Sequence, residues 1–276
     1  MPLPSPPSLD MLSAVILGVV QGIAEFLPIS SSGHLAIGQA LLGVDPSVGG
    51  LKLNVLLHAG TLLAVLVVFR RDLWTLVAAM LPGAGPSNAR RRGVAIIVGS
   101  TPLVVALVPA VEHTVLRLER SMTAVGIALL CTAAMLAFSH RATPPEDDAD
   151  EAPSLPHALC IGVAQVIAIA PGISRSGSTI AAALGLGMGR DRAARFSFLL
   201  SVPAVAAATL KTGLEFAGEP EVHSDGMLAY LVGFLVSFVV GLASLTGLLR
   251  LIRRFGMLPF VPYLIAVGLL SIWMAR

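Results

Sequence analysis

The hydrophobic positions of this chain form long uninterrupted blocks, and charged residues cluster between the blocks. Uncharged, strongly apolar runs occur at 53–69, 94–111, 122–139, 196–210, 227–249 and 259–275. These runs approach the roughly 20 residues that a helix needs to cross the hydrocarbon core of a bilayer. A membrane β-barrel would show alternating segments of about ten residues instead, and the sequence contains no such segments. The pattern predicts an all-α integral membrane protein with six full crossings.

Two further apolar regions, 11–44 and 156–187, do not resemble single spans. In each, a hydrophobic helix meets a break rich in Pro, Ser and Gly, at 27–33 and 170–177, and a short apolar piece follows. Proline interrupts the helical hydrogen-bond ladder, and serine favours a new helix start. Non-helical backbone at membrane depth persists only inside protein or beside a wet cavity. Both regions are therefore predicted to be re-entrant helical hairpins with their tips inside the membrane.

The two breaks are similar in sequence. Residues 29–33 read Ile-Ser-Ser-Ser-Gly, and residues 173–177 read Ile-Ser-Arg-Ser-Gly. Three predicted spans follow each break, so the second unit enters the membrane from the opposite face. This arrangement is typical of an inverted-topology repeat. The sequence thus predicts a single membrane domain, 1–276, with a first repeat at 11–140 and a second at 156–275.

Composition and charge agree with this interpretation. Apolar residues make up 55% of the 276 residues and charged residues 12%, about half the charged fraction of a soluble domain. The net charge of +2 excludes nucleic-acid binding as a main activity. If the six spans alternate, most of the 18 lysines and arginines share one side. The positive-inside rule assigns that side to the cytoplasm, so both termini are predicted to be external.

Two charged residues, Glu25 and Arg175, lie deep within apolar segments, each in or beside a break. Such a group inside a membrane indicates a functional site, although a structural ion pair between the two would also explain them. The planar arginine fork suits a phosphate. Hydroxyl groups surround it in the predicted phosphate-binding set, which consists of Ser30, Ser174, Arg175, Ser176 and Thr179. Simple helix capping accounts for one or two of these hydroxyls, but not for a buried arginine.

The first hairpin offers further chemistry. Gln21 and Glu25 are four residues apart and share a helix face. Together they can hold a divalent cation with phosphate oxygens, or Glu25 can act as a general base. Next to Ser31 and Glu25, His34 is a candidate nucleophile or proton donor. For His58 we favour span packing through a backbone hydrogen bond.

These residues resemble a known family. The stretch Gln21-Gly-Ile-Ala-Glu25-Phe-Leu-Pro-Ile-Ser-Ser31-Ser-Gly-His34 is similar to the first signature of the undecaprenyl-diphosphate phosphatases of the BacA/UppP type. Pro171-Gly-Ile-Ser-Arg175-Ser-Gly-Ser-Thr179 resembles their second signature, and the residues from Phe196 to Pro203 resemble a third. Glutamine stands at position 21, where many members of the family have glutamate.

The resemblance implies an enzyme of the bacterial plasma (inner) membrane that hydrolyses undecaprenyl diphosphate to undecaprenyl phosphate and phosphate. Such an enzyme recycles the lipid carrier of peptidoglycan synthesis and confers bacitracin resistance. It also implies an active site open to the external side and a divalent cation, Mg²⁺ or Ca²⁺, for which Glu25 and Gln21 are the candidate ligands by their chemistry. The catalytic set carried over is Glu25, Ser31, His34 and Arg175.

Several alternatives stay open at this point. Ser31 is the preferred nucleophile with His34 as its proton partner, but a direct attack by His34 is the alternative. A secondary transporter or a lipid-carrier flippase with a midplane anion site would share the same anatomy. The sequence also leaves open whether the protein is a monomer or a homodimer.

Overall fold

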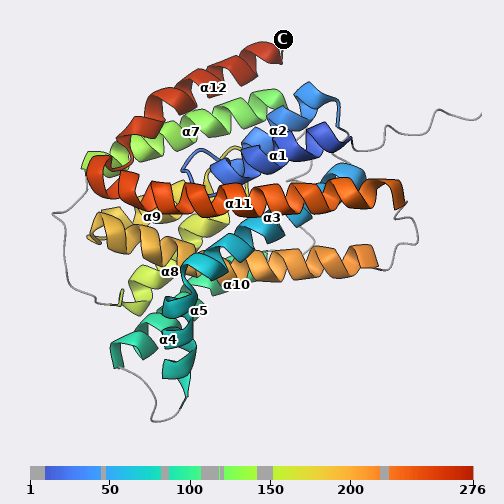
Figure 1. Cartoon of the computed structure of the whole chain (residues 1–276). Helices are drawn as coiled ribbons and strands as arrows, with labels where there is room; N and C mark the ends of the chain where they lie inside the picture. Colours follow the sequence, from blue (N-terminus) through green and yellow to red (C-terminus); the bar gives the residue numbers. More distant parts are fainter. Residues whose placement is uncertain are drawn as a thin grey trace, which may run out of the picture.

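The structure is a computed structural model that describes residues 10–44, 48–81, 87–106, 118, 121–141, 152–217 and 224–275. Within these ranges the chain is helical and contains no strand. The helices are α1 (Met11–Ala24), α2 (Ser31–Leu42), α3 (Val48–Val68), α4 (Arg70–Met80), α5 (Ser87–Ala106), α7 (Met122–Arg141), α8 (Leu155–Ile167), α9 (Arg175–Gly185), α10 (Arg190–Ala217), α11 (Ser224–Phe255), the short 3₁₀ helix η1 (Leu258–Phe260) and α12 (Val261–Met274). Figure 1 shows their arrangement as a helical bundle.

Helices lie where the hydrophobic blocks predicted spans. Four segments are long and apolar enough to cross a membrane: Gly50–Val68, Met122–His140, Arg190–Lys211 and Met227–Phe255. The apolar segment Leu258–Met274 is shorter. The predicted span 94–111 begins in α5, and its last residues, 107–111, lie outside the described part of the chain. The prediction of an all-α, multi-pass membrane protein is confirmed.

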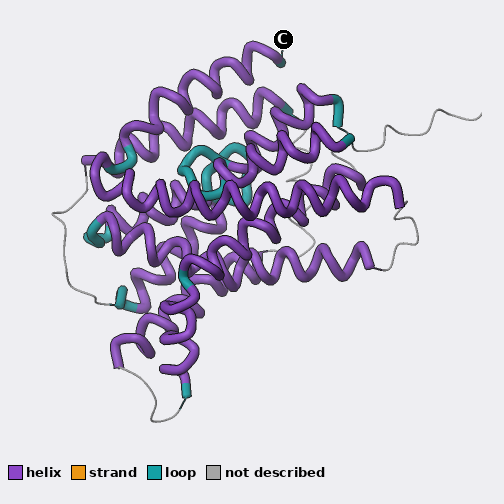
Figure 2. The backbone as a smooth tube through the Cα atoms, viewed as in Figure 1, coloured by secondary structure: helices purple, strands orange, loops and turns teal. Residues whose placement is uncertain are grey.

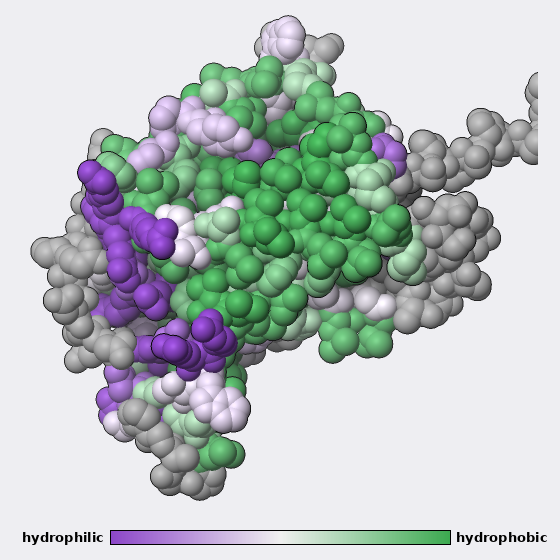
Figure 3. Space-filling model, viewed as in Figure 1, coloured by the Kyte–Doolittle hydropathy of each residue, from purple (hydrophilic) through white to green (hydrophobic). Residues whose placement is uncertain are grey.

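The surface has the character of a membrane protein. Figure 3 shows a broad hydrophobic face across the bundle, with hydrophilic side chains gathered at one end. Helix α11 crosses the front of the bundle in the same view (Figure 1), and its exposed large apolar side chains include Leu228, Leu231, Leu235 and Val239. An exposed apolar area of this kind is rare on soluble monomers and suits contact with lipid.

Both predicted helix breaks are present, and they lie two or three residues earlier than the sequence placed them. Helix α1 ends at Ala24 and α2 begins at Ser31; α8 ends at Ile167 and α9 begins at Arg175. Serine side chains set these starts. Ser30 Oγ accepts the Gly33 amide at 3.3 Å and Ser174 Oγ accepts the Gly177 amide at 3.1 Å, as N-caps do. Figure 2 shows loop segments in the middle of the bundle, between helices.

The two breaks contact each other. Ser176 Oγ, at the start of α9, donates a hydrogen bond to the carbonyl oxygen of Leu27 at 3.2 Å. A Cβ on Gly33 would lie 3.1 Å from the Cα of Gly172. Gly172 itself has φ +94° and packs against the backbone of Val125, where a Cβ would lie 2.6 Å from the carbonyl oxygen. Only glycine combines this left-handed backbone with so close an approach.

Helices α5 and α8 also touch backbone to backbone. A Cβ on Gly162 would lie 2.1 Å from the carbonyl oxygen of Gly99, the small-residue packing common between membrane helices. We expect Gly162→Ala to push the helices apart and to lower the free energy of unfolding by ~1–3 kcal/mol, measured by thermal unfolding in detergent. Gly247→Ala is the matched control, because nothing lies within 4 Å of a Cβ there. Alanine at that position should be neutral or stabilising, and equal losses in both variants would contradict the packing argument.

Three parts of the chain with unusual proline content or charge lie outside the described residues. These are the proline-rich start at 1–9, the acidic stretch at 146–151, and the basic residues Arg117 and Arg120.

Candidate functional site

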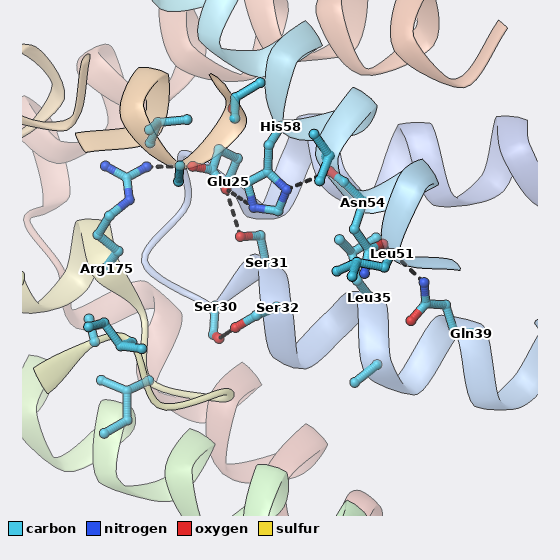
Figure 4. Close-up of a pocket in the computed structure, with 18 of the residues that line it drawn as sticks. Glu25, Ser30, Ser31, Ser32, Leu35, Gln39, Leu51, Asn54, His58 and Arg175 are labelled. Atoms are coloured by element: carbon cyan, nitrogen blue, oxygen red, sulfur yellow. Dashed lines mark hydrogen bonds and ion pairs between the residues drawn. The ribbon is translucent and has the colours of Figure 1, made fainter. Parts of the chain in front are cut away.

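The two charged residues inside the membrane region lie together. Glu25 immediately follows α1, and Arg175 is the first residue of α9. The Nη2 group of Arg175 donates a hydrogen bond to Oε1 of Glu25, and the two side chains are 17% and 6% exposed (Figure 4). Because each residue flanks a helix break, the contact between the breaks brings the opposite charges together, 150 residues apart in sequence.

The second oxygen of the Glu25 carboxylate faces the first hairpin. Ser31 Oγ donates to Oε2 at 2.6 Å, and Gln21 Nε2 donates to the same atom at 3.1 Å. His58 Nε2 lies 3.7 Å from it. A serine hydroxyl bonded to a carboxylate is the arrangement of a nucleophile and its general base. The carboxylate can therefore take the Ser31 proton, while Arg175 offsets its charge.

Ser31 follows a strained residue. Ser30 has φ +72° and ψ +99°, and it is the one non-glycine residue with positive φ among the residues that the structure describes. Such backbone persists where its surroundings hold it and is concentrated at functional sites. The carbonyl oxygen of Ser30 accepts the backbone N–H of His34 at 3.2 Å and its Nδ1 at 2.8 Å.

His34 does not pair with Ser31. Its Nε2 lies 2.8 Å from the hydroxyl of Tyr263 in α12, and the two rings stack at 5.6 Å between centroids. The sequence prediction made His34 the proton partner of Ser31; in the structure the Ser31 hydroxyl donates its hydrogen bond to Glu25. No pattern in the sequence indicated Tyr263, which lies 229 residues from His34.

A cavity of about 470 Å³ opens beside these groups. Its polar lining includes Glu25, Ser30, Ser31, Ser32, Gln39, Asn54, His58, Gln165 and Arg175. Its apolar lining comes mainly from α2, α3, the second break and α10: Leu35, Ala36, Ala40, Val44, Leu51, Val55, Ala168, Ile169, Ile173, Ala204, Val205 and Ala208. Polar groups beside an apolar wall suit a ligand with a charged head and a hydrophobic tail.

Three of the predicted phosphate-binding hydroxyls do not line the cavity. Ser174 caps α9, and Ser176 bonds to Leu27 across the breaks. Thr179 is fully buried and bonds to the carbonyl oxygen of Arg175 at 2.9 Å and to the Ser197 hydroxyl. These three hydroxyls hold the start of α9, where Arg175 lies. The hydroxyl residues that line the cavity are Ser30, Ser31, Ser32 and Thr209.

Two residues line the cavity although the sequence analysis did not place them in the functional site. His58 makes the expected backbone hydrogen bond, from Nδ1 to the carbonyl oxygen of Asn54 at 2.7 Å, but it also faces Glu25 and lines the cavity. Gln165 lines the cavity and is 1% exposed, yet neither atom of its amide has a hydrogen-bond partner among the described residues. The same holds for Nη1 of Arg175. Buried polar atoms of this kind need a partner, which a ligand can supply.

The donor atoms around Glu25 do not form a divalent cation site in this arrangement. Both carboxylate oxygens of Glu25 already accept hydrogen bonds, from Arg175, Ser31 and Gln21, whereas Oε1 of Gln21 has no hydrogen-bond partner among the described residues. The described residues also contain no cluster of three or more His, Cys, Asp or Glu side chains suited to a metal. Hard cations take several oxygen ligands, and here an arginine already neutralises the single carboxylate.

Comparisons with known proteins agree on one family. Residues 14–270 match the family model described as bacitracin resistance protein BacA. An undecaprenyl-diphosphatase of Geobacter sulfurreducens is 41% identical over 94% of this chain and 96% of its own. One of Korarchaeum cryptofilum is 40% identical over 95% and 98%, and one of Desulfosudis oleivorans is 38% identical over 96% and 98%.

Proposed function

The chain belongs to the BacA family, and from this premise we propose that it hydrolyses undecaprenyl diphosphate to undecaprenyl phosphate and inorganic phosphate. The observation that carries the proposal is the Ser31–Glu25–Arg175 arrangement at a cavity that is lined largely by apolar side chains. By this reaction the protein recycles the lipid carrier for peptidoglycan synthesis, and its overproduction gives resistance to bacitracin.

The geometry supports a covalent mechanism. Ser31 Oγ attacks the terminal phosphorus, the bond from that phosphorus to the bridging oxygen breaks, and Glu25 takes the serine proton. Undecaprenyl phosphate leaves, and water then cleaves the phosphoserine to release phosphate. The free Nη1 of Arg175 binds phosphate oxygens and stabilises the charge that develops on them. A phosphohistidine at His34 is the alternative intermediate.

The apolar lining of the cavity receives the beginning of the isoprenoid tail. Small side chains of α10, Ala204 and Ala208, and apolar residues of α2, among them Leu35 and Ala40, line this cavity. The diphosphate then lies at the wall formed by Glu25, and the hydrocarbon extends away from it.

We also propose that the protein lies in the plasma membrane, with both termini and the cavity on the external side and with the two halves in inverted orientation.

A divalent cation, Mg²⁺ or Ca²⁺, stays a prediction that the family resemblance implies. Because Arg175 forms an ion pair with the Glu25 carboxylate, the proposed mechanism uses no metal ion. Phosphate release with and without a chelator tests the dependence.

The proposed activity is tested by phosphate release from undecaprenyl diphosphate by the purified protein in detergent micelles. Hydrolysis can be measured in micelles, whereas the activity of a transporter or flippase requires a membrane between two compartments. We expect release of one phosphate per lipid, with undecaprenyl phosphate as the other product. Transport in vesicles without phosphate release in detergent would contradict the proposal.

Replacement of Gln165 by leucine separates stability from function. Because its buried amide has no protein partner among the described residues, an apolar side chain of similar volume should leave the thermal unfolding temperature unchanged or raise it. We expect phosphate release to fall about tenfold, since the amide no longer binds a phosphate oxygen.

Gln39→Leu is the matched control, because Gln39 lines the same cavity but donates to Asn54 Oδ1 at 3.0 Å. This substitution leaves Asn54 without that donor and should lower the unfolding temperature. Full activity in Gln165→Leu would show that the amide does not contact the substrate.

A further inference from the structure

A chain of contacts joins α12 to the strained residue beside Ser31. The Tyr263 hydroxyl lies 2.8 Å from Nε2 of His34, with the two rings within 11° of parallel. His34 Nδ1 in turn lies 2.8 Å from the carbonyl oxygen of Ser30. Of the residues joined by these contacts, Tyr263 alone comes from the C-terminal end of the protein.

The partners fix the direction of each hydrogen bond. A carbonyl oxygen can only accept, so Nδ1 of His34 carries a hydrogen and donates it to Ser30. In a neutral imidazole, Nε2 is then an acceptor, and the Tyr263 hydroxyl donates to it. Both ring nitrogens are therefore engaged in holding the ring, and neither points to Ser31.

This series of hydrogen bonds ends at the Ser30 carbonyl oxygen, which accepts both the backbone N–H and the Nδ1–H of His34. Ser30 has φ +72°, a conformation that favours glycine. The next residue, Ser31, donates to Glu25 at 2.6 Å. The orientation of the Ser30 peptide therefore sets where the Ser31 hydroxyl lies.

We propose that Tyr263 is a positioning residue for the reaction: by fixing the tautomer and orientation of His34, it holds the left-handed Ser30 and so presents Ser31 to Glu25. This inference rests on the proposed phosphatase function. It assigns His34 to the support of the serine nucleophile and gives α12 a part in the site.

The first experiment is Tyr263→Phe, which keeps the ring and removes the donor. We expect kcat for phosphate release to fall about tenfold with KM unchanged, as for the loss of one hydrogen bond that orients a reacting group. Tyr230→Phe is the matched control, since Tyr230 is the other tyrosine of the chain and packs against the leucine cluster Leu17, Leu35, Leu53 and Leu57. Equal kinetics in Tyr263→Phe and wild type would overturn the proposal.

A double-mutant cycle with Ser30→Gly tests the route through Ser30. Glycine adopts the left-handed backbone without strain, so the support from His34 matters less. We expect Tyr263→Phe to cost less than about twofold in the Ser30→Gly background, against tenfold in the parent. The same tenfold loss in both backgrounds would show that Tyr263 does not act through Ser30.

The tautomer of His34 gives a readout that does not depend on activity. In protein with ¹⁵N-labelled histidine, the His34 signals, identified by their loss in His34→Gln, should show a hydrogen on Nδ1 and a bare Nε2. Tyr263→Phe should convert them to a mixture of tautomers. An inactive wild-type protein with this signature would contradict the proposed function alone. Unchanged His34 signals in Tyr263→Phe would contradict the positioning role alone.

Discussion

Ser31→Ala is expected to lower kcat for phosphate release by about a thousandfold or more, the scale on which enzymes lose activity when their nucleophile is removed. The reason is the Ser31–Glu25 hydrogen bond of 2.6 Å, which places the hydroxyl on its base beside the cavity. Alanine keeps α2 intact, because the helix is capped by Ser30 and not by Ser31. The measurement is single-turnover phosphate release in detergent, with the unfolding temperature as a check on folding.

Ser32→Ala is the control for this variant. Ser32 also faces the cavity, but its hydroxyl lies 3.4 Å from Ser30 Oγ and does not contact Glu25. We expect a loss of no more than about tenfold, the scale of a single hydrogen bond. Acid quenching of the reaction should trap phosphoserine at Ser31. Full turnover by Ser31→Ala, or phosphate found on His34 after an alkaline quench, which preserves phosphohistidine, would assign the attack to the histidine instead.

Arg175→Ala and Glu25→Ala are each expected to reduce the rate at least about a hundredfold. Glu25 is the counter-ion of Arg175 and accepts from Ser31; in the proposed mechanism Arg175 binds the phosphate and Glu25 is the base. Each single change also leaves the opposite charge buried without its partner, which costs ~3–5 kcal/mol of folding stability. Rates are therefore measured below the unfolding temperature of each variant.

The double variant Glu25→Gln with Arg175→Met separates the two effects. It removes both charges and keeps the volumes similar, so the unfolding temperature should recover toward that of the wild type. Phosphate release should stay as low as in the single variants, because neither the base nor the phosphate ligand is restored. Near-normal turnover in Arg175→Ala and Glu25→Ala would instead make the pair a structural lock between the two breaks.

The spans and the breaks were predictable because the physical signals are local. A bilayer-length apolar run indicates a membrane helix wherever it occurs, and proline followed by serine and glycine interrupts one. The exact helix starts were not predictable. They depend on which serine caps the amide three residues later, and Ser30 and Ser174 do so from within the predicted breaks.

The site was predictable in part for a similar reason. Glu25 and Arg175 are conspicuous because charge inside a membrane is costly. The direction of each hydroxyl was not predictable, since it depends on which face of α9 packs inward; Thr179 faces Ser197 in the core. Tyr263 and Gln165 were missed because a tyrosine or glutamine in an apolar helix is unremarkable until the fold shows its neighbours.

The Glu25–Arg175 contact has a consequence for how the protein is made. The ribosome adds about 150 residues between the two, so the carboxyl group is synthesised and inserted well before its counter-ion exists. An incomplete chain that stops before position 175 carries the serine and the glutamate but no phosphate ligand. Under the proposed mechanism, hydrolytic competence therefore arises only after the second break has been synthesised and inserted.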